Sequence, residues 1–224
     1  MQRVLEPEVM DGQEQSDAYA FADFAAPNAA FVERFLQLFP AFCCLGKRAE
    51  SAVAVDLGCG PADIPIRLCR AVPRLRVLGV DASAAMIGHA QRAVRAAGLG
   101  ERVTLREAYL PAELPGPFDA VVSNSLLHHL PDPSVLWDTI ASQAAPGAPI
   151  LVIDLFRPDS QDAARGIVEE YATGEPEVLR HDFFHSLCAA FTPEEVTGQL
   201  AAAGLAHLEV HAISDRHLAV WGTR

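Results

Sequence analysis

The sequence predicts an α/β protein built on a seven-stranded, mostly parallel sheet with an antiparallel last strand, helices on both faces and an N-terminal helical cap. Short apolar runs alternate with helical patterns through the middle of the 224-residue chain, which is typical of βαβ units and a parallel sheet. Two strand-like runs separated by only a short turn close the chain, which is typical of an antiparallel hairpin.

The individual elements follow from the residue pattern. Apolar residues recur at helical spacing over residues 16–45, and Pro27 interrupts them, so two helices are expected there. Residues 158–192 are expected to be helical, without a strand. Thr192 is a good N-cap for a last helix that Gly204 ends. The remaining predictions are strands at 52–57, 76–80, 102–106, 120–123, 149–155, 207–213 and 216–221, and helices at 64–72, 83–98 and 132–145.

The composition excludes several partners. The formal net charge of −12 repels phosphate backbones, so we expect no nucleic-acid partner. No uncharged apolar run reaches the roughly 20 residues that span a bilayer, so we expect no membrane partner. The first thirty residues show no basic-then-apolar leader, and the five cysteines fall in no zinc-like spacing. These features predict a cytoplasmic protein with reduced thiols and no metal; a homodimer is left open.

A glycine turn follows the first predicted strand. Gly58 and Gly60 fit the first two positions of the dinucleotide pattern GxGxxG, but Asp63 occupies the third. A carboxylate at the start of the following helix would repel a pyrophosphate, and no lysine follows as it would in a P-loop. The turn therefore disfavours NAD and other phosphate-containing cofactors.

The same turn suits a ligand that carries positive charge and no phosphate. Gly58 and Gly60 permit close approach of the backbone and positive φ angles. Asp56, at the carboxyl end of the strand, attracts an ammonium group directly or through water, and the helix start accepts a carboxylate. S-adenosylmethionine, with its amino-acid end and its sulfonium, meets these requirements.

Over residues 50–157 the chain resembles class I (Rossmann-like) S-adenosylmethionine-dependent methyltransferases of the small-molecule type. One motif is weak, but five occur in order at the family's intervals. They are the acidic glycine turn from Asp56 to Ala62, where Ala62 replaces a glycine, the strand-ending acid Asp81, the loop at Tyr109, the run from Phe118 to Leu130, and the turn from Pro146 to Ile153.

The resemblance implies roles in binding the cofactor. Asp81 accepts from both ribose hydroxyls, and Met86 packs on the adenine, although plain core packing is an equal alternative for Met86. Tyr109 stands where the family has an adenine-binding aspartate, so backbone groups at Tyr109 or Leu110 would replace it. The full set expected at the cofactor is Asp56, Gly58, Gly60, Asp81, Ala82, Met86, Tyr109, Leu110, Asn124 and Tyr19, the last closing over it or serving as a core aromatic.

The resemblance also divides the single domain of residues 1–224 into four regions. These are an N-terminal helical cap (1–48), a cofactor-binding core (49–157), a helical acceptor-lid insertion (158–192), and a closing helix and hairpin (193–224).

Fewer sequence features indicate where the acceptor binds. His128 and His129 follow the strand that ends at Asn124, and one of them is expected to act as a general base or to orient the acceptor, unless the pair only caps a helix. Arg157, Tyr171 and Arg180 are expected to hold an anionic or hydroxylated acceptor, with a solvated surface position as the alternative for each. His181 and His185, four residues apart, are expected in the acceptor pocket; a metal site is the less favoured alternative, because it would need further ligands.

The sequence therefore predicts an enzyme that transfers a methyl group from S-adenosylmethionine to a small-molecule acceptor, with S-adenosylhomocysteine as the other product. The attacking atom is left open between oxygen, nitrogen, sulfur and carbon. The alternative is a non-catalytic S-adenosylmethionine-binding or partner protein of the same fold, since fold alone does not fix function.

Overall fold

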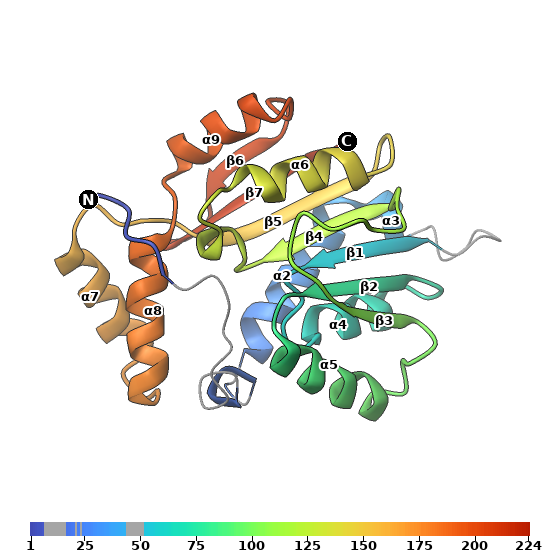
Figure 1. The fold of residues 1–224 in the computed structure, drawn as a ribbon, viewed down its shortest axis with the longest axis horizontal. Coiled ribbons are helices and arrows are strands. Elements are labelled where there is room, and N and C mark those ends of the chain that lie inside the picture. The colour runs from blue at the N-terminus through green and yellow to red at the C-terminus, as the bar shows by residue number, and fades with distance from the viewer. Residues whose placement is uncertain (7–16, 21, 23, 44–51) are drawn as a thin grey trace.

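The computed structural model describes residues 1–6, 17–20, 22, 24–43 and 52–224, and the statements below concern these residues. A seven-stranded sheet in the order β3-β2-β1-β4-β5-β7-β6 forms the centre (Figure 1). All neighbouring strands are parallel except β7, which runs antiparallel to both β5 and β6. The predicted fold class is confirmed. The strands are β1 (Val53–Leu57), β2 (Arg76–Asp81), β3 (Val103–Glu107), β4 (Ala120–Asn124), β5 (Pro149–Leu155), β6 (Glu209–Ala212) and β7 (His217–Thr223).

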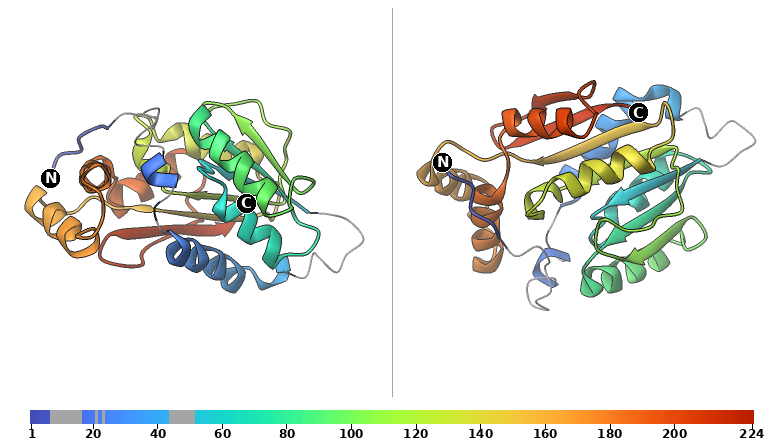
Figure 2. Two further views of the ribbon diagram at one scale, coloured as in Figure 1. Left: turned by 90° about the horizontal axis from the view of Figure 1, so that it is seen from below. Right: turned by 45° about the horizontal axis from the view of Figure 1, so that its top comes forward.

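Helices pack on both faces of the sheet, as Figures 1 and 2 show. One face carries α2, α4 and α5, whose buried residues share a core with Leu151 of β5. The other carries α6 and α9, around Trp137 and Val196. The helices are α2 (Ala25–Leu38), α3 (Pro40–Cys43), α4 (Asp63–Ala71), α5 (Ala84–Ala96), the 3-10 turn η2 (Leu127–His129), α6 (Ser134–Gln143), α7 (Gln161–Tyr171), α8 (Glu177–Ala189) and α9 (Pro193–Ala202).

The N-terminal helices differ in one detail from the sequence prediction. Pro27 does not separate two helices but lies in the first turn of α2, where its missing N–H removes no intrahelical hydrogen bond. α2 itself lies against the sheet beside α4, whereas the helical residues 17–20 stand at the carboxyl edge of the strands. Residues 44–48 of the predicted cap lie outside the described part of the chain.

The C-terminal half follows the predicted pattern closely. Thr192 caps α9 with a full capping box, since its side chain accepts from the N–H of Glu195 while the Glu195 carboxylate accepts from the N–H of Thr192. α7 and α8 lie beyond the carboxyl ends of the strands, and the first six residues run alongside α8 (Figure 1). None of the described helices is long and apolar enough to cross a membrane.

Candidate active site

A crevice opens at the carboxyl edge of β1, β2 and β4, where ligands bind in open α/β sheets. Nine of the ten residues predicted to bind the cofactor line it; the tenth, Asp56, lies directly before the glycine turn. The nine are Tyr19, Gly58, Gly60, Asp81, Ala82, Met86, Tyr109, Leu110 and Asn124.

The glycine turn is tied to the neighbouring strand β2. The backbone N–H groups of Gly58 and Cys59 donate to the carbonyl of Val80 over 2.8 and 3.0 Å. Gly58 and Gly60 have φ angles of 74° and 50°, in the left-handed region that favours glycine. A Cβ at Gly60 would meet no atom within 4 Å, so this part of the turn is open to a ligand.

Asp63 begins α4, as the sequence predicted, but its carboxylate is engaged outside the crevice. Its carboxylate accepts from the Asn28 amide over 3.0 Å and from Arg67 over 2.7 Å, and Asp63 is not among the residues lining the crevice. The exclusion of a pyrophosphate therefore rests on the absence of a third glycine and on the buried acid Asp56, and not on repulsion by Asp63.

Asp81, at the end of β2, is held by two backbone donors. Its Oδ1 accepts from the N–H of Ser83 over 2.9 Å and its Oδ2 from the N–H of Gly60 over 2.8 Å. Burial raises the pKa of Asp81, and these hydrogen bonds oppose the rise. Each carboxylate oxygen keeps lone-pair capacity, so the side chain is fixed in position and still able to accept from two hydroxyls of a ligand.

Asp56 is a buried carboxylate without a hydrogen-bond donor. The residue is 1 % exposed, and neither carboxylate oxygen has a hydrogen-bond partner among the described residues. Burial, and next the negative charge of Asp81, raise the pKa of Asp56 to about 8. An unpaired buried acid is costly to keep, and a cationic ligand at the adjoining turn would offset that cost. The residues present therefore fit S-adenosylmethionine.

A second cavity of about 330 Å³ adjoins the crevice, which itself holds about 100 Å³. The two share Tyr19, Asn124, Ser125 and His129. Tyr19 is half-buried at this junction, and desolvation of its hydroxyl raises its pKa to about 12. The larger cavity continues beneath α7 and α8, where its lining includes Tyr171, Glu175, Leu179, Asp182, Phe183 and Ser186.

The structure brings few of the predicted acceptor residues to this cavity. Tyr171 lines it, but Arg157, Arg180, His181 and His185 do not. Arg157 is 8 % exposed, and its guanidinium donates to the carbonyls of Met1 and Ala190 and pairs with Glu195. These contacts occupy the guanidinium N–H groups of Arg157 that would otherwise bind an anionic acceptor.

The other three residues lie on or near the outside of α8. Arg180 is exposed. His181 and His185 pack against each other, with their Nε2 atoms 3.1 Å apart, while Asp182, Phe183 and Ser186 of the same helix line the cavity. The arginine that lines the cavity is Arg216, which the sequence analysis missed because β7 showed no functional motif.

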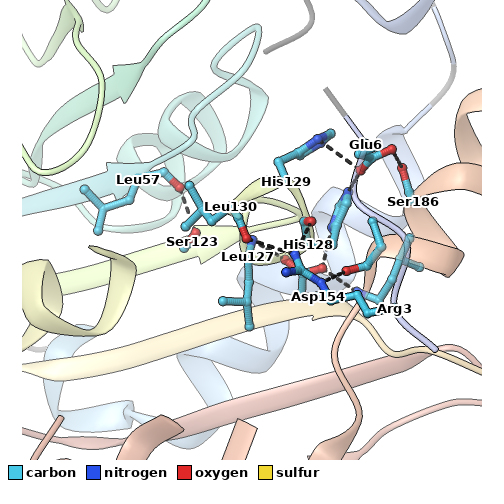
Figure 3. Close-up of polar contacts among 12 residues, drawn as sticks. Arg3, Glu6, Leu57, Ser123, Leu127, His128, His129, Leu130, Asp154 and Ser186 are labelled. Atoms are coloured by element: carbon cyan, nitrogen blue, oxygen red, sulfur yellow. Dashed lines mark hydrogen bonds and ion pairs between the residues drawn. The ribbon is translucent and has the colours of Figure 1, made fainter. Parts of the chain in front are cut away.

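His128 and His129 meet two carboxylates at the junction, as Figure 3 shows. The Nδ1 of His128 lies 2.5 Å from Asp154 Oδ1, and its Nε2 lies 3.6 Å from Glu6 Oε1. The Nδ1 of His129 lies 3.1 Å from the same Glu6 oxygen. Burial lowers the pKa of His128, but the attraction and hydrogen bond of Asp154 outweigh it, so that the pKa is raised.

The N-terminal segment delivers Glu6 to this cluster. Arg3 donates to the carbonyls of His128 and Leu130 over 3.0 and 2.9 Å, and its guanidinium stacks 3.8 Å from the Phe191 ring centre. No sequence signal pointed to Glu6, which is far from the histidines along the chain. Asp154 could have been identified from the sequence, because it is an acid inside an otherwise apolar strand.

The sheet order, the open glycine turn and the acid that ends β2 define a Rossmann-like class I methyltransferase domain. Residues 55–150 match the family model described as "Methyltransferase domain". The chain therefore contains a class I S-adenosylmethionine-dependent methyltransferase domain, as the five motifs predicted.

Several curated relatives share this domain. A trans-aconitate 2-methyltransferase of Azoarcus sp. (strain BH72) is 34% identical over 109 residues, which is 48% of this chain and 40% of the relative. That of Streptomyces coelicolor is 30% identical over 70% of this chain and 52% of its own length. An uncharacterized methyltransferase of Mycobacterium tuberculosis (strain ATCC 25618 / H37Rv) is 29% identical over 65% of this chain and 72% of its own. The chain thus spans about half or less of the two trans-aconitate enzymes.

Solved structures share the whole fold at low identity. A SAM-dependent methyltransferase from Aquifex aeolicus superposes with a TM-score of 0.64 at 18% identity, covering 93% of this chain and 97% of its own. The plantazolicin methyltransferase BpumL, solved with a desmethylPZN analog and SAH, has a TM-score of 0.70 at 12% identity, covering 95% and 90%. Both extend the match beyond residues 55–150 to most of the chain.

Proposed function

We propose that this protein transfers the methyl group of S-adenosylmethionine to a small-molecule acceptor that binds beneath α7 and α8. The observation that carries the proposal is the junction of the two cavities at Asn124, Ser125 and His129. A cofactor in the crevice would present its methyl group there, to an atom that enters from the larger cavity.

The chain's own residues would bind, orient and exclude water. Bound S-adenosylmethionine supplies an electrophilic methyl group on a sulfonium. Asp81 would hold the ribose hydroxyls, the open turn at Gly60 would receive the amino-acid end, and Met86 and Leu110 would flank the adenine. Tyr19 covers the junction from residues 17–20, so its ring keeps water from the reacting atoms.

His129 is the histidine that lines both cavities, whereas His128 lines only the larger one. We therefore assign contact with the attacking atom to His129. His128, hydrogen-bonded to the buried Asp154, supports it from behind.

The cavity lining favours a neutral or cationic acceptor with an apolar or aromatic body. Its aromatic residues include Phe24, Tyr171 and Phe183, and its acids are Glu175 and Asp182. Among the described residues that line the cavity, Arg216 is the single arginine and there is no lysine. The Arg216 guanidinium is already engaged by Asp215 at 2.7 Å and by the Tyr171 ring. A polycarboxylate such as the acceptor named for the trans-aconitate relatives finds no unengaged arginine or lysine among the described residues that line this cavity.

The non-catalytic alternative is tested together with this proposal. Isothermal titration should detect binding of S-adenosylmethionine, and a pooled acceptor screen with isotopically labelled cofactor should detect a methylated product by mass spectrometry. We expect amines, phenols and other uncharged aromatic compounds among the acceptors, and no methylation of trans-aconitate. Absence of cofactor binding at millimolar concentration would reject the proposal, while tight binding without any methylated product would favour the alternative.

A further inference from the structure

A group of three potential metal ligands lies at the wall of the acceptor cavity. Glu6, His128 and His129 each direct one ligand-type atom into a space in which all three atoms lie within 4.8 Å of one another. The side chains of Glu6 and His128 are 7 % and 4 % exposed, and that of His129 is 14 % exposed. No metal was predicted from the sequence.

The hydrogen bonds around the cluster leave three lone pairs facing one another. His128 gives its Nδ1 to Asp154 over 2.5 Å, so in the neutral ring its Nε2 presents a lone pair to Glu6. Ser186 donates to Oε2 of Glu6 over 3.2 Å, which leaves Oε1 for the histidines. Lone pairs that face one another in a buried site repel unless a cation lies between them.

Two of these atoms have no hydrogen-bond partner among the described residues. Oε1 of Glu6 and Nδ1 of His129 are both buried without a hydrogen bond, although they lie only 3.1 Å apart. A proton on either atom is therefore not aligned to bridge the two. Such a pair, close but without a hydrogen bond, is the arrangement of two ligands of one ion.

The spacing agrees with tetrahedral zinc. Ligand atoms about 2.0–2.2 Å from a zinc ion lie about 3.3 Å from one another in a tetrahedron. The separations from Glu6 Oε1 to the two histidines are 3.1 and 3.6 Å. Asp154 stands behind His128 as the carboxylate does behind zinc-bound histidines in many metalloenzymes.

The charges also permit a divalent cation. The carboxylates of Glu6 and Asp154 are partly balanced by the guanidinium of Arg3, which interacts with both. One negative charge is left over if the histidines are neutral, and a zinc ion would reverse it to a single positive charge. A neutral acceptor whose hydroxyl or amine group binds the ion and loses its proton would neutralise that remainder.

We propose that Glu6, His128 and His129 form a divalent-cation site, with zinc as the preferred ion, at the wall of the acceptor cavity. Two histidines and one glutamate leave the fourth position of a tetrahedral zinc open. His129 lines the junction of the cavities, so this position is available to the acceptor. The binding of an acceptor's oxygen or nitrogen to the ion, which would lower the pKa of that group, rests on the proposed function. The metal site itself does not rest on it.

The experiment uses the full chain without a histidine tag, stripped of metal by a chelator and then titrated with Zn²⁺ against a competing chromophoric chelator. We expect one equivalent to bind in the micromolar range or more tightly. Glu6→Gln, which keeps the shape of the side chain and removes its charge, should weaken binding at least 100-fold. Asp154→Asn should weaken it about 10- to 100-fold, since it changes only the support of His128.

A matched control separates this site from adventitious binding. His181→Ala/His185→Ala removes the exposed histidine pair on α8 and should leave the one equivalent and its affinity unchanged. Co²⁺ should give the visible spectrum of a tetrahedral site in this double variant and lose it in Glu6→Gln. Thermal unfolding of each metal-free variant shows whether it is folded, and His129→Ala serves as a second ligand variant if Glu6→Gln is not.

Three results would overturn the proposal. They are no binding of zinc up to 100 µM, binding that Glu6→Gln and His129→Ala leave unchanged, or binding that disappears with His181 and His185. Titration of S-adenosylmethionine into the same samples keeps the two proposals distinguishable, because the residues that hold the cofactor are separate from Glu6.

Discussion

The cofactor crevice and the acceptor cavity share one edge of the sheet but differ in how the chain builds them. The crevice takes the glycine turn and Asp81 from the ends of the adjacent strands β1 and β2, and Tyr19, Tyr109 and Asn124 from other segments. The cavity takes its lining from residues 19, 24–28, 124–129, 155, 171–186 and 216–217, and the N-terminal segment adds Glu6 beside it. The polar groups expected to hold the cofactor therefore come mainly from neighbouring strand ends, whereas the cavity depends on the packing of segments that are far apart in the sequence. The predictions below test this difference, beginning with the largest effect.

Asp81→Asn should give the largest loss. Asp81 accepts from two backbone N–H groups and offers its remaining lone pairs to the ribose, and an amide can replace only part of this. We expect the affinity for S-adenosylmethionine to fall at least about 100-fold, or roughly 3 kcal/mol, by isothermal titration. Glu101→Gln, which removes an exposed acid outside both cavities, is the matched control. Unchanged affinity in Asp81→Asn would contradict the ribose assignment.

Asp56 should make cofactor affinity depend on pH. Its pKa is about 8 in the free protein, and a cationic ligand favours the ionised form, so binding below pH 8 releases a proton. The affinity should rise with pH, by up to about tenfold per unit, and level off above about pH 8. In Asp56→Asn this contribution should vanish, which also corrects for titration of the cofactor's own amino group. Equal pH profiles for both proteins would contradict the idea.

The same acid should lower stability at neutral and alkaline pH. Between the pKa of an unfolded Asp, about 3.9, and about 8, the folded protein binds the extra proton, so stability falls as pH rises through this window. Asp56→Asn removes that loss and should raise Tm by several degrees at pH 8, with little gain at pH 4. A Tm gain combined with weaker cofactor binding would identify Asp56 as a functional acid kept at a cost to stability.

Changes in the acceptor cavity should leave cofactor binding intact. Phe183→Ala enlarges the cavity and removes an aromatic contact, so we expect KM for an identified acceptor to rise about tenfold while the Kd of S-adenosylmethionine stays within twofold. Arg180→Ala decides between sequence and structure, because the sequence placed Arg180 at the acceptor and the structure leaves it exposed outside the cavity. A comparable rise in KM for Arg180→Ala would favour the sequence-based assignment.

Thr192→Ala should give the smallest effect. It removes one half of the capping box of α9, which lines neither cavity, and should cost about 1 kcal/mol, or roughly 2–4 °C in Tm. Kd and KM should not change. A change in either constant would mean that the closing helix, and not only the cavity walls, is coupled to the site.

The sequence by itself determined the sheet, its closing hairpin and the cofactor site. These features depend on local signals: apolar runs of strand length, glycines that adopt positive φ, and acids at the ends of strands. Asp56, Gly60 and Asp81 could be named because the turn that joins β1 to α4 and the end of β2 meet in every parallel βαβ unit. Residues 158–192 were also predicted to be helical, but the sequence did not show which helix faces would point toward the cavity.

Only the tertiary structure decided what surrounds the acceptor. Arg157 and Arg216 are both arginines near the end of a strand, and only packing turned the first into a buried structural group and left the second at the cavity. Likewise, the periodicity of α8 does not say that Asp182 and Phe183 face the cavity while His181 and His185 face away. Glu6 reaches the histidines because Arg3 and Ser186 fix the first segment against η2 and α8. Contacts between residues so far apart in sequence depend on the sum of many packing interactions, and no local sequence pattern predicts them.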